Sequence, residues 1–196
     1  METPDRYFLG RRMQLAFLVS DMEQAIDVWT HTLKVGPFVI FEHAMGDRHF
    51  MYRGERSPVD LALALSYVGD TQIELICPHN DAPSIYSDAM RKGLSGAMAH
   101  HMAFWPDDMD AARRELTRKG FNEVATIQSP AGEVDVYYFS SPAALGLILE
   151  IVPMNSSRRT YFGQIQAQCE SADASQAPQR YRDKNHFLEV LAASRA

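Results

Sequence analysis

Hydrophobic positions in the first part of the chain change from a strand-like run to a helical spacing. Residues 14–19 form a short apolar run, and after it Met22, Ile26, Trp29 and Leu33 recur on one face at helical spacing. An apolar stripe of this period is typical of an amphipathic helix. The pattern therefore predicts a strand followed by a helix.

The same pattern occurs again in the second half of the chain. The segments QLAFLVSDMEQAI (14–26) and HMAFWPDDMDAAR (101–113) share Ala, Phe, Asp, Met and Ala at equal spacing. Self-similarity of this kind indicates one supersecondary unit that is used twice. We expect two equivalent helices, the first beginning at Ser20 with Glu23 as its capping-box partner and the second beginning at Asp107.

Three short β-rich runs follow each predicted helix. Turn-forming residues at 69–70 and 130–132 favour hairpins between neighbouring runs. The predicted fold class is α+β, with two tandem βαβββ modules that form a cupped, partly open mixed sheet and a C-terminal helical tail. The runs are PFVIFEH, DLALALSYV and TQIELIC in the first module, and NEVATI, EVDVYYF and LGLILEIV in the second.

The repeat divides the chain into four parts. We expect a first module at 1–79, a linker at 80–97, a second module at 98–153 and a helical or partly disordered tail at 154–196. No chemistry is expected in the tail, which lies outside the repeat. The polar stretch 44–59 is longer than an ordinary hairpin loop, so it predicts a lid or a binding edge.

The composition and charge of the chain limit its expected partners and location. The chain has 196 residues, of which 46% are hydrophobic, and a formal charge of -6 with an isoelectric point near 5.6. Such a charge argues against nucleic acid and anionic membranes as partners. No apolar run approaches the roughly 20 residues that span a bilayer, and the N-terminal segment lacks the apolar core of a signal peptide, so we expect a cytoplasmic protein. Cys77 and Cys169 form no CxxC pair, and Cys77 is expected to be a reduced, buried thiol.

Four polar residues occupy equivalent positions of the two modules. Gln14 and His101 begin the first strands, while Glu74 and Glu150 interrupt the apolar last strands. Taken singly, each is more typical of a solvated strand face or of a hydrogen-bonded core histidine. Together they form an N/O donor set, and a divalent cation would stabilise two buried carboxylates at once. The set suits Zn, Ni, Co, Mn or Fe, and four ligands on a six-coordinate ion leave two positions for substrate oxygens.

With these residues in place, the sequence resembles the vicinal oxygen chelate superfamily, the glyoxalase, bleomycin resistance and dioxygenase type. It is most similar to glyoxalase-like and methylmalonyl-CoA epimerase-like members. The similarity runs from Met13 to Pro153 through QLAFLVSDMEQAIDVW, VGPFVIFE, YVGDTQIELICP, HHMAFWPDDMDAA and LGLILEIVP. The Gln, Glu, His, Glu order looks like that of glyoxalase I enzymes. The resemblance places metal ligands at Gln14, Glu74, His101 and Glu150.

The choice between the two adjacent histidines rests on strand alternation. Only one of His100 and His101 should face the cup, and the alignment with Gln14 selects His101. His100 is then expected in the opposite packing layer. The positions that grip glutathione in glyoxalase I fall near Leu18, Pro78 and Ala97, which cannot play that part, so glutathione conjugates are not expected.

The resemblance implies a metal-dependent lyase, or an isomerase or epimerase, that acts on a small substrate with vicinal oxygens through an enolate. Its cofactor is one divalent metal ion, and the protein is expected to be a homodimer. Glu150 is the expected catalytic base, with Glu74 as the second candidate.

Two alternative functions use the same fold. An extradiol-type dioxygenase holds iron with a second histidine, expected at position 14, where Gln14 stands. A resistance-type binding protein sequesters a small molecule without metal. In either case aromatic residues can line a pocket, although plain core packing is the alternative. Arg53 is a candidate for an anionic group unless it is simply solvated. The substrate-binding candidates are Phe38, Tyr52, Arg53, Trp105 and Tyr137, with Tyr138 beside the last of these.

Overall fold

The first module has the predicted order of one strand, one helix and three strands. The computed structural model describes residues 8–10, 13–93 and 95–194. Across the sheet the strands of this module follow the order β2-β5-β6-β1. The elements are β1 (Met13–Val19), α1 (Met22–Asp27), the π-helical turn η1 (Val28–Thr32), β2 (Val39–Phe41), β5 (Leu61–Val68) and β6 (Thr71–Pro78).

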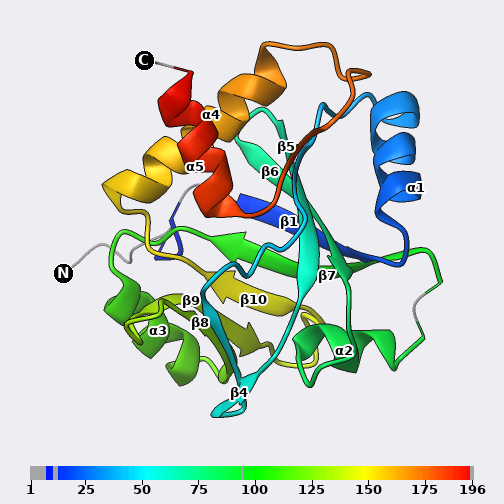
Figure 1. Ribbon diagram of the computed structural model, residues 1–196. Coiled ribbons are helices and arrows are strands. Elements are labelled where there is room, and N and C mark those ends of the chain that lie inside the picture. The colour runs from blue at the N-terminus through cyan, green and yellow to red at the C-terminus, as the bar shows by residue number, and fades with distance from the viewer. Residues whose placement is uncertain (1–7, 11–12, 94, 195–196) are drawn as a thin grey trace.

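The second module repeats this order and completes one continuous sheet. Its strands follow the order β7-β10-β9-β8, and β7 pairs antiparallel with β1 at the centre of the sheet (Figure 1). The predicted fold class is therefore confirmed. The elements are β7 (Ala97–Phe104), α3 (Met109–Arg118), β8 (Asn122–Gln128), β9 (Val134–Ser140) and β10 (Ile148–Ile151).

Both repeated helices begin one residue later than predicted. The N-cap of α1 is Asp21, whose carboxylate accepts from the backbone N–H of Gln24 at 2.9 Å. The N-cap of α3 is Asp108, which accepts from the N–H of Ala111 at 2.8 Å. The capping box at Ser20 is wrong, because the Ser20 hydroxyl donates to the carbonyl of Gly96 instead. The two caps are nevertheless the aspartates that the repeat aligns.

The polar stretch 44–59 is a hairpin in part, where we expected a loop. β3 (His49–Tyr52) and β4 (Glu55–Ser57) pair with each other, and β3 also pairs with β8 of the second module. Phe50 explains this docking, because its ring is 1% exposed in the core. The hairpin thus extends the far edge of the sheet.

The linker contains a short helix. α2 (Ile85–Met90) begins at Ser84, which forms a capping box with Ser87. Tyr86 is buried on this helix and stacks on His100, with ring centroids 5.1 Å apart. The linker therefore packs against the centre of the sheet.

The tail is folded over the sheet through most of its length. α4 (Ser156–Glu170) contacts β5, β11 (Gln179–Tyr181) pairs in parallel with β2, and α5 (Lys184–Ala193) follows. The strand β11 lies in the tail, which we expected to be helical or partly disordered. Figure 1 shows α4 and α5 side by side over the first module, and their rings Tyr161 and Phe187 lie 5.6 Å apart. No helix of the described residues is long and apolar enough to cross a membrane.

The two faces of the sheet bury different hydrophobic clusters. On the outer face α1 packs through Ile26, and α3 packs through Leu116. On the inner face the tail packs through Tyr161, Ile165 and Phe187. The inner face is therefore enclosed by the chain itself, which separates the concave surface from solvent. Both cysteines are free thiols; Cys169 is buried and Cys77 is half-buried.

Candidate metal centre

Four neighbouring strands bring the predicted ligands together on the inner face. The strands β6, β1, β7 and β10 are adjacent at the centre of the sheet, and each contributes one side chain. All four residues are at most 8% exposed. We call this group the cup cluster: Gln14, Glu74, His101 and Glu150.

Strand register explains why the four side chains meet. Ala103 lies opposite both Gln14 and Glu150 in the neighbouring strands, and Ala16 lies opposite the other two members of the cluster. Alternation places both alanines on the same face as the cluster. Their small side chains leave the polar groups room to approach one another.

His101 is the centre of the cup cluster. Its Nε2 atom lies 3.2 Å from Glu74 Oε2, 3.2 Å from Glu150 Oε2 and 3.3 Å from Gln14 Oε1. Burial alone would lower the pKa of His101, but hydrogen bonds to the two carboxylates outweigh it and raise the pKa to about 9. Burial raises the pKa of Glu74, and His101 opposes that rise. The imidazole therefore carries a proton between two carboxylates.

The donor set fits a divalent metal ion. One amide oxygen, one imidazole nitrogen and two carboxylates are ligands that transition metals of this class accept. A protonated His101 can balance one of the two carboxylates, whereas a divalent ion would neutralise both. These residues could therefore hold the metal that the sequence predicts.

Gln72 orients Gln14, and the sequence analysis missed it. Gln14 Nε2 donates to Gln72 Oε1 at 2.5 Å, so that Gln14 Oε1 is directed toward His101. Gln72 in turn donates to the hydroxyl of Tyr67 and is fully buried. The available signal was its position two residues before Glu74, which puts both side chains on the same face of β6.

The prediction for His100 is wrong, because a β-bulge changes its direction. Ala16 lies opposite His101 and Phe17 lies opposite Ala99, so His100 is the extra residue of β7. Its Nδ1 atom is 3.0 Å from Nδ1 of His101, and its Nε2 atom is 3.3 Å from the carbonyl of Ile85. Burial lowers the pKa of His100 to about 3, so it is neutral and can donate only through one nitrogen.

This neutral histidine fixes the direction of His101. His100 donates from Nε2 to the carbonyl of Ile85 and accepts from His101 at Nδ1. His101 is thereby left with Nε2 facing the carboxylates. Such an outer partner selects the nitrogen that binds a metal.

A cavity of about 90 Å³ lies between the cup cluster and the tail. Gln14, Glu74 and Glu150 form polar parts of its lining, and Arg158 and Lys184 come from the tail. The tail, in which we expected no chemistry, thus contributes side chains to the wall of the cavity. Most of the wall is aromatic or aliphatic, including Phe41, Leu65, Trp105, Tyr138, Tyr161 and Phe162.

The residues that we predicted to bind substrate lie in the cavity, on the outer face of the sheet and in a surface hollow. Trp105 lines the cavity, as does Tyr138. Phe38 packs under α1 and Tyr137 under α3, both on the outer face and away from the cavity, contrary to expectation. In β9 the side chain of Tyr138 points to the inner face of the sheet, so strand alternation places that of Tyr137 on the outer face.

Tyr52 and Arg53 lie outside the enclosed cavity. They line a separate surface hollow beside α2, where both contact Asp88. Arg53 is therefore paired with a carboxylate of this chain. The structure does not bring these two residues to the cup cluster.

A second group of metal-ligand residues lies at the end of three strands of the first module. His43 Nδ1 is 2.9 Å from Asp60 Oδ1, and His79 Nδ1 is 3.2 Å from Asp60 Oδ2. We call these three residues the rim cluster. Their donor atoms lie close enough together to hold a metal ion. The sequence analysis did not find them, because they are dispersed in the chain and occupy no equivalent positions of the repeat.

The family can now be assigned. Residues 13–138 match the family model of the Glyoxalase/Bleomycin resistance protein/Dioxygenase superfamily. The chain belongs to this superfamily. The match ends before β10 and the tail, so Glu150 and the tail residues of the cavity lie outside the matched region. No curated protein matches the sequence.

Solved structures share the superfamily fold at low identity. Methylmalonyl-CoA epimerase from Mycobacterium tuberculosis is 19% identical with a TM-score of 0.55, over 82% of this chain and 97% of that chain. A hypothetical protein from Bacillus halodurans C-125 is 15% identical with a TM-score of 0.55, over 74% and 95%. A variant of Streptomyces coelicolor methylmalonyl-CoA epimerase, in complex with 2-nitronate-propionyl-CoA, is 17% identical with a TM-score of 0.51, over 74% and 96%. These likenesses show the fold alone.

Proposed function

We propose that the protein is a metal-dependent lyase, or an isomerase or epimerase, that acts on a small substrate with two neighbouring oxygen atoms. The observation that supports this most is the convergence on His101 of Gln14, Glu74 and Glu150, all within 3.3 Å of its Nε2 atom at the floor of the cavity. We assign one divalent ion, Zn, Ni, Co, Mn or Fe, to these four side chains. When bound, such an ion would supply a Lewis acid that polarises substrate oxygens and acidifies the adjacent C–H group.

Glu150 and Glu74 are the proposed bases. They belong to equivalent strands of the two modules, lie on either side of His101 and both line the cavity. A carboxylate that takes a proton from carbon and returns it to another atom produces an isomer, and expulsion of a leaving group produces elimination. Two carboxylates on different sides of the substrate also permit inversion, since one removes the proton and the other returns it.

Tyr138 is the proposed hydrogen-bond donor to the substrate. Burial, together with the charge of Glu150, holds the pKa of Tyr138 well above its ordinary value, so the phenol stays protonated. Tyr86 donates to its oxygen at 3.4 Å. The proton of Tyr138 can therefore point into the cavity, toward an oxygen that gains negative charge during the reaction.

The surroundings of His100 weigh against the dioxygenase alternative. A second imidazole close to His101 would be a candidate iron ligand. However, Nδ1 of His100 faces His101 and its Nε2 faces the carbonyl of Ile85. Both nitrogen atoms thus have partners within the protein, and Gln14 stands at the position where that class of enzyme has histidine.

Solvent proton exchange tests the proposal. Protein loaded in turn with each of the five metals is incubated in D2O with 2-oxo acids, 2-hydroxy acids and acyl thioesters, and loss of the C–H signal is followed by proton NMR. We expect exchange with wild type and with Glu133→Gln, whose side chain is exposed on the β8–β9 turn, and exchange about 10² to 10⁴ slower with Glu150→Gln. Exchange at the wild-type rate in Glu150→Gln would contradict the role of Glu150. Wild type that binds these compounds without exchanging protons would leave the binding-protein alternative.

A further inference from the structure

Three basic side chains line the end of the cavity next to the tail. Arg48 comes from the loop before β3, Arg158 from α4 and Lys184 from the start of α5. We call these residues the cation cluster. Arg158 is only 6% exposed, and the other two are half-buried.

Neutral groups hold the two guanidinium groups in place. Arg48 donates from Nη2 to the carbonyl of Ala44 at 2.6 Å and from Nε to that of Met45 at 3.3 Å. Arg158 donates from Nη1 to the carbonyls of Pro153 at 2.9 Å and of Asp135 at 3.3 Å. Carbonyl groups fix the direction of a guanidinium but leave its charge uncompensated.

Lys184 is also held without a carboxylate. Its ammonium lies 5.0 Å from the centre of the Tyr161 ring. Burial lowers the pKa of Lys184, and the nearby positive charges of Arg158 and Arg48 lower it further. The three cations are therefore close enough to repel one another.

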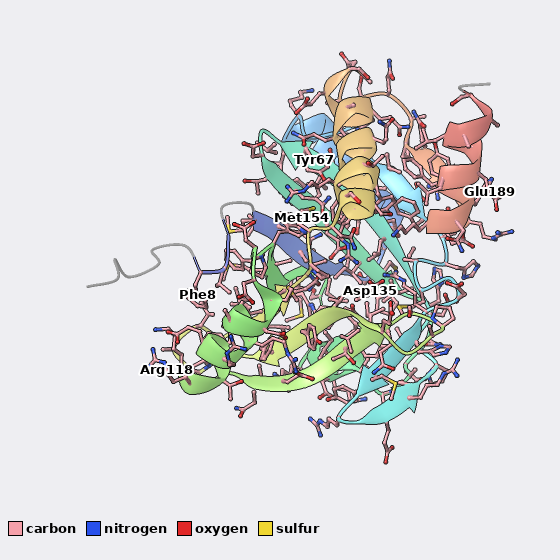
Figure 2. All side chains as sticks on the ribbon, turned by 90° about the vertical axis from the view of Figure 1, so that its left-hand side faces the viewer. Phe8, Tyr67, Arg118, Asp135, Met154 and Glu189 are labelled. Atoms are coloured by element: carbon pink, nitrogen blue, oxygen red, sulfur yellow. The ribbon has the colours of Figure 1, made fainter. Side chains whose placement is uncertain are left out.

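Few carboxylates oppose this positive charge. Asp135 lies 3.7 Å from Arg158 and is 34% exposed, and Figure 2 shows it below the ends of α4 and α5. Asp183, which lines an adjoining hollow with Lys184, is paired with Arg182 at 2.8 Å. Glu74 and Glu150 are the carboxylates that line the cavity itself, and a divalent ion would neutralise them. The cation cluster would then have positive charge available for a further anion.

We infer that Arg48, Arg158 and Lys184 bind a carboxylate of the substrate, which makes the substrate a small oxoacid or hydroxyacid anion. The inference rests on the proposed function, because it takes the neighbouring oxygens of the same molecule to lie at the cup cluster. The cup cluster and the cation cluster line the same cavity, so one small molecule can contact both. Two of the three cations come from the tail, which the family match does not include.

Titration calorimetry with pyruvate, its neutral analogue pyruvamide and inorganic phosphate tests this site. Each probe is added to chelator-treated and to zinc-loaded protein. Lys184→Met removes one cation and leaves the buried Arg158 in place. Lys119→Met at the C-cap of α3, at 45% side-chain exposure, is the matched control, and Lys184→Arg restores the charge. We expect wild type to bind pyruvate, and Lys184→Met to bind it about tenfold to a hundredfold more weakly. Lys119→Met and Lys184→Arg should stay within about twofold of wild type.

Several results would overturn the inference. It fails if pyruvamide binds as tightly as pyruvate, or if Lys184→Met binds pyruvate like wild type. Phosphate binding in place of pyruvate would refute the assignment to a carboxylate. Its failure is distinguishable from failure of the proposed function. If protein that takes up no metal binds pyruvate in a Lys184-dependent way, the carboxylate site is supported and the metal-dependent reaction is contradicted. If the protein exchanges protons but Lys184 does not affect pyruvate binding, the reaction is supported and the carboxylate site is contradicted.

Discussion

The cup cluster and the rim cluster use the same types of residue in opposite surroundings. In the rim cluster one carboxylate, Asp60, accepts from two histidines, and the side chains of His43 and His79 are 58% and 36% exposed. In the cup cluster two carboxylates face one histidine, whose side chain is fully buried. In the rim cluster two imidazole groups hydrogen-bond to a single carboxylate near solvent. In the cup cluster two carboxylates share one imidazole and are buried away from water.

This difference indicates at which cluster a bound metal ion would stabilise the protein more. Hydrogen bonds from His43 and His79 lower the pKa of Asp60 although burial opposes them, so its carboxylate is already stabilised. In the cup cluster His101 faces both carboxylates and burial raises the pKa of Glu74, whereas a divalent ion would neutralise both carboxylates at once. The cup cluster also lines an enclosed cavity, where a substrate would be shielded from solvent. Residue type alone does not distinguish the two clusters, so our proposal of the cup cluster as the metal centre rests on burial and charge balance.

Removing a carboxylate from the cup cluster should have the largest effect. Glu150→Gln keeps the shape of the side chain and removes the proposed base, so we expect the rate of solvent proton exchange to fall by about 10² to 10⁴. NMR in D2O measures this rate. His43→Ala in the rim cluster, measured beside it, should exchange protons like wild type. An equal loss in both variants would remove the distinction between the clusters.

Removing a buried aromatic ring of the tail should have the next largest effect, on the free energy of unfolding. Phe187 is fully buried and packs edge-on against Phe41 at 5.8 Å and against Tyr181 at 4.9 Å. Phe187→Ala should lower the free energy of unfolding by about 3–5 kcal/mol, measured by urea denaturation. Leu188→Ala, at a neighbouring position that is 36% exposed, should change it by less than about 1 kcal/mol. Equal effects of the two would mean that the tail does not pack on the cup in solution.

Gln72→Leu tests whether the cup cluster depends on its outer partners. Without Gln72 the amide of Gln14 loses the acceptor that directs its oxygen toward His101. We expect zinc affinity, measured by competition with a chromogenic chelator, to fall by about tenfold to a hundredfold. Gln128→Leu at the far end of β8 is the control, for which wild-type affinity is expected. Unchanged affinity in Gln72→Leu would show that Gln14 does not need this support.

Metal binding should stabilise the protein more as the pH rises. The raised pKa of His101, about 9, means that the metal-free protein keeps this proton and that the ion must displace it. In metal-free protein the stability from His101 is fully present below its unfolded pKa of about 6.5 and is lost as pH rises through about 9. The difference in melting temperature between zinc-loaded and chelator-treated protein should therefore widen from pH 6.5 to 9. A gap that narrows would contradict the displacement of a proton.

The rim cluster should give the smallest effect. His43 and Asp60 form an exposed pair, and such pairs contribute little to stability. The double variant His43→Ala with His79→Ala should melt within about 2 °C of wild type and retain proton exchange. Differential scanning calorimetry measures the first property. A large loss of exchange would move the catalytic centre to the rim.

Much of the fold could be predicted because the information is local and repeated. The change between helical and strand spacing fixed the order of elements, and the repeat matched Gln14 with His101 and Glu74 with Glu150. Equivalent positions of a symmetric sheet converge, so the cup cluster followed from the alignment.

The remaining features depend on contacts between distant segments. The direction of His100 follows from a bulge in the pairing of β7 with β1, and no spacing in the sequence reports it. Tyr137 and Tyr138 are adjacent, so the choice between them required the phase of β9. Arg158 and Lys184 reach the cavity only because α4 and α5 pack on the inner face.

The most direct test of the account is the metal content of the purified protein. Wild type, His101→Ala and the double variant His43→Ala with His79→Ala are prepared without chelating resin, reconstituted with the same ion and analysed by inductively coupled plasma mass spectrometry. We expect about one tightly held ion per chain in wild type and in the double variant, and almost none in His101→Ala. Metal that stays in His101→Ala and disappears from the double variant would place the centre at the rim and contradict the account.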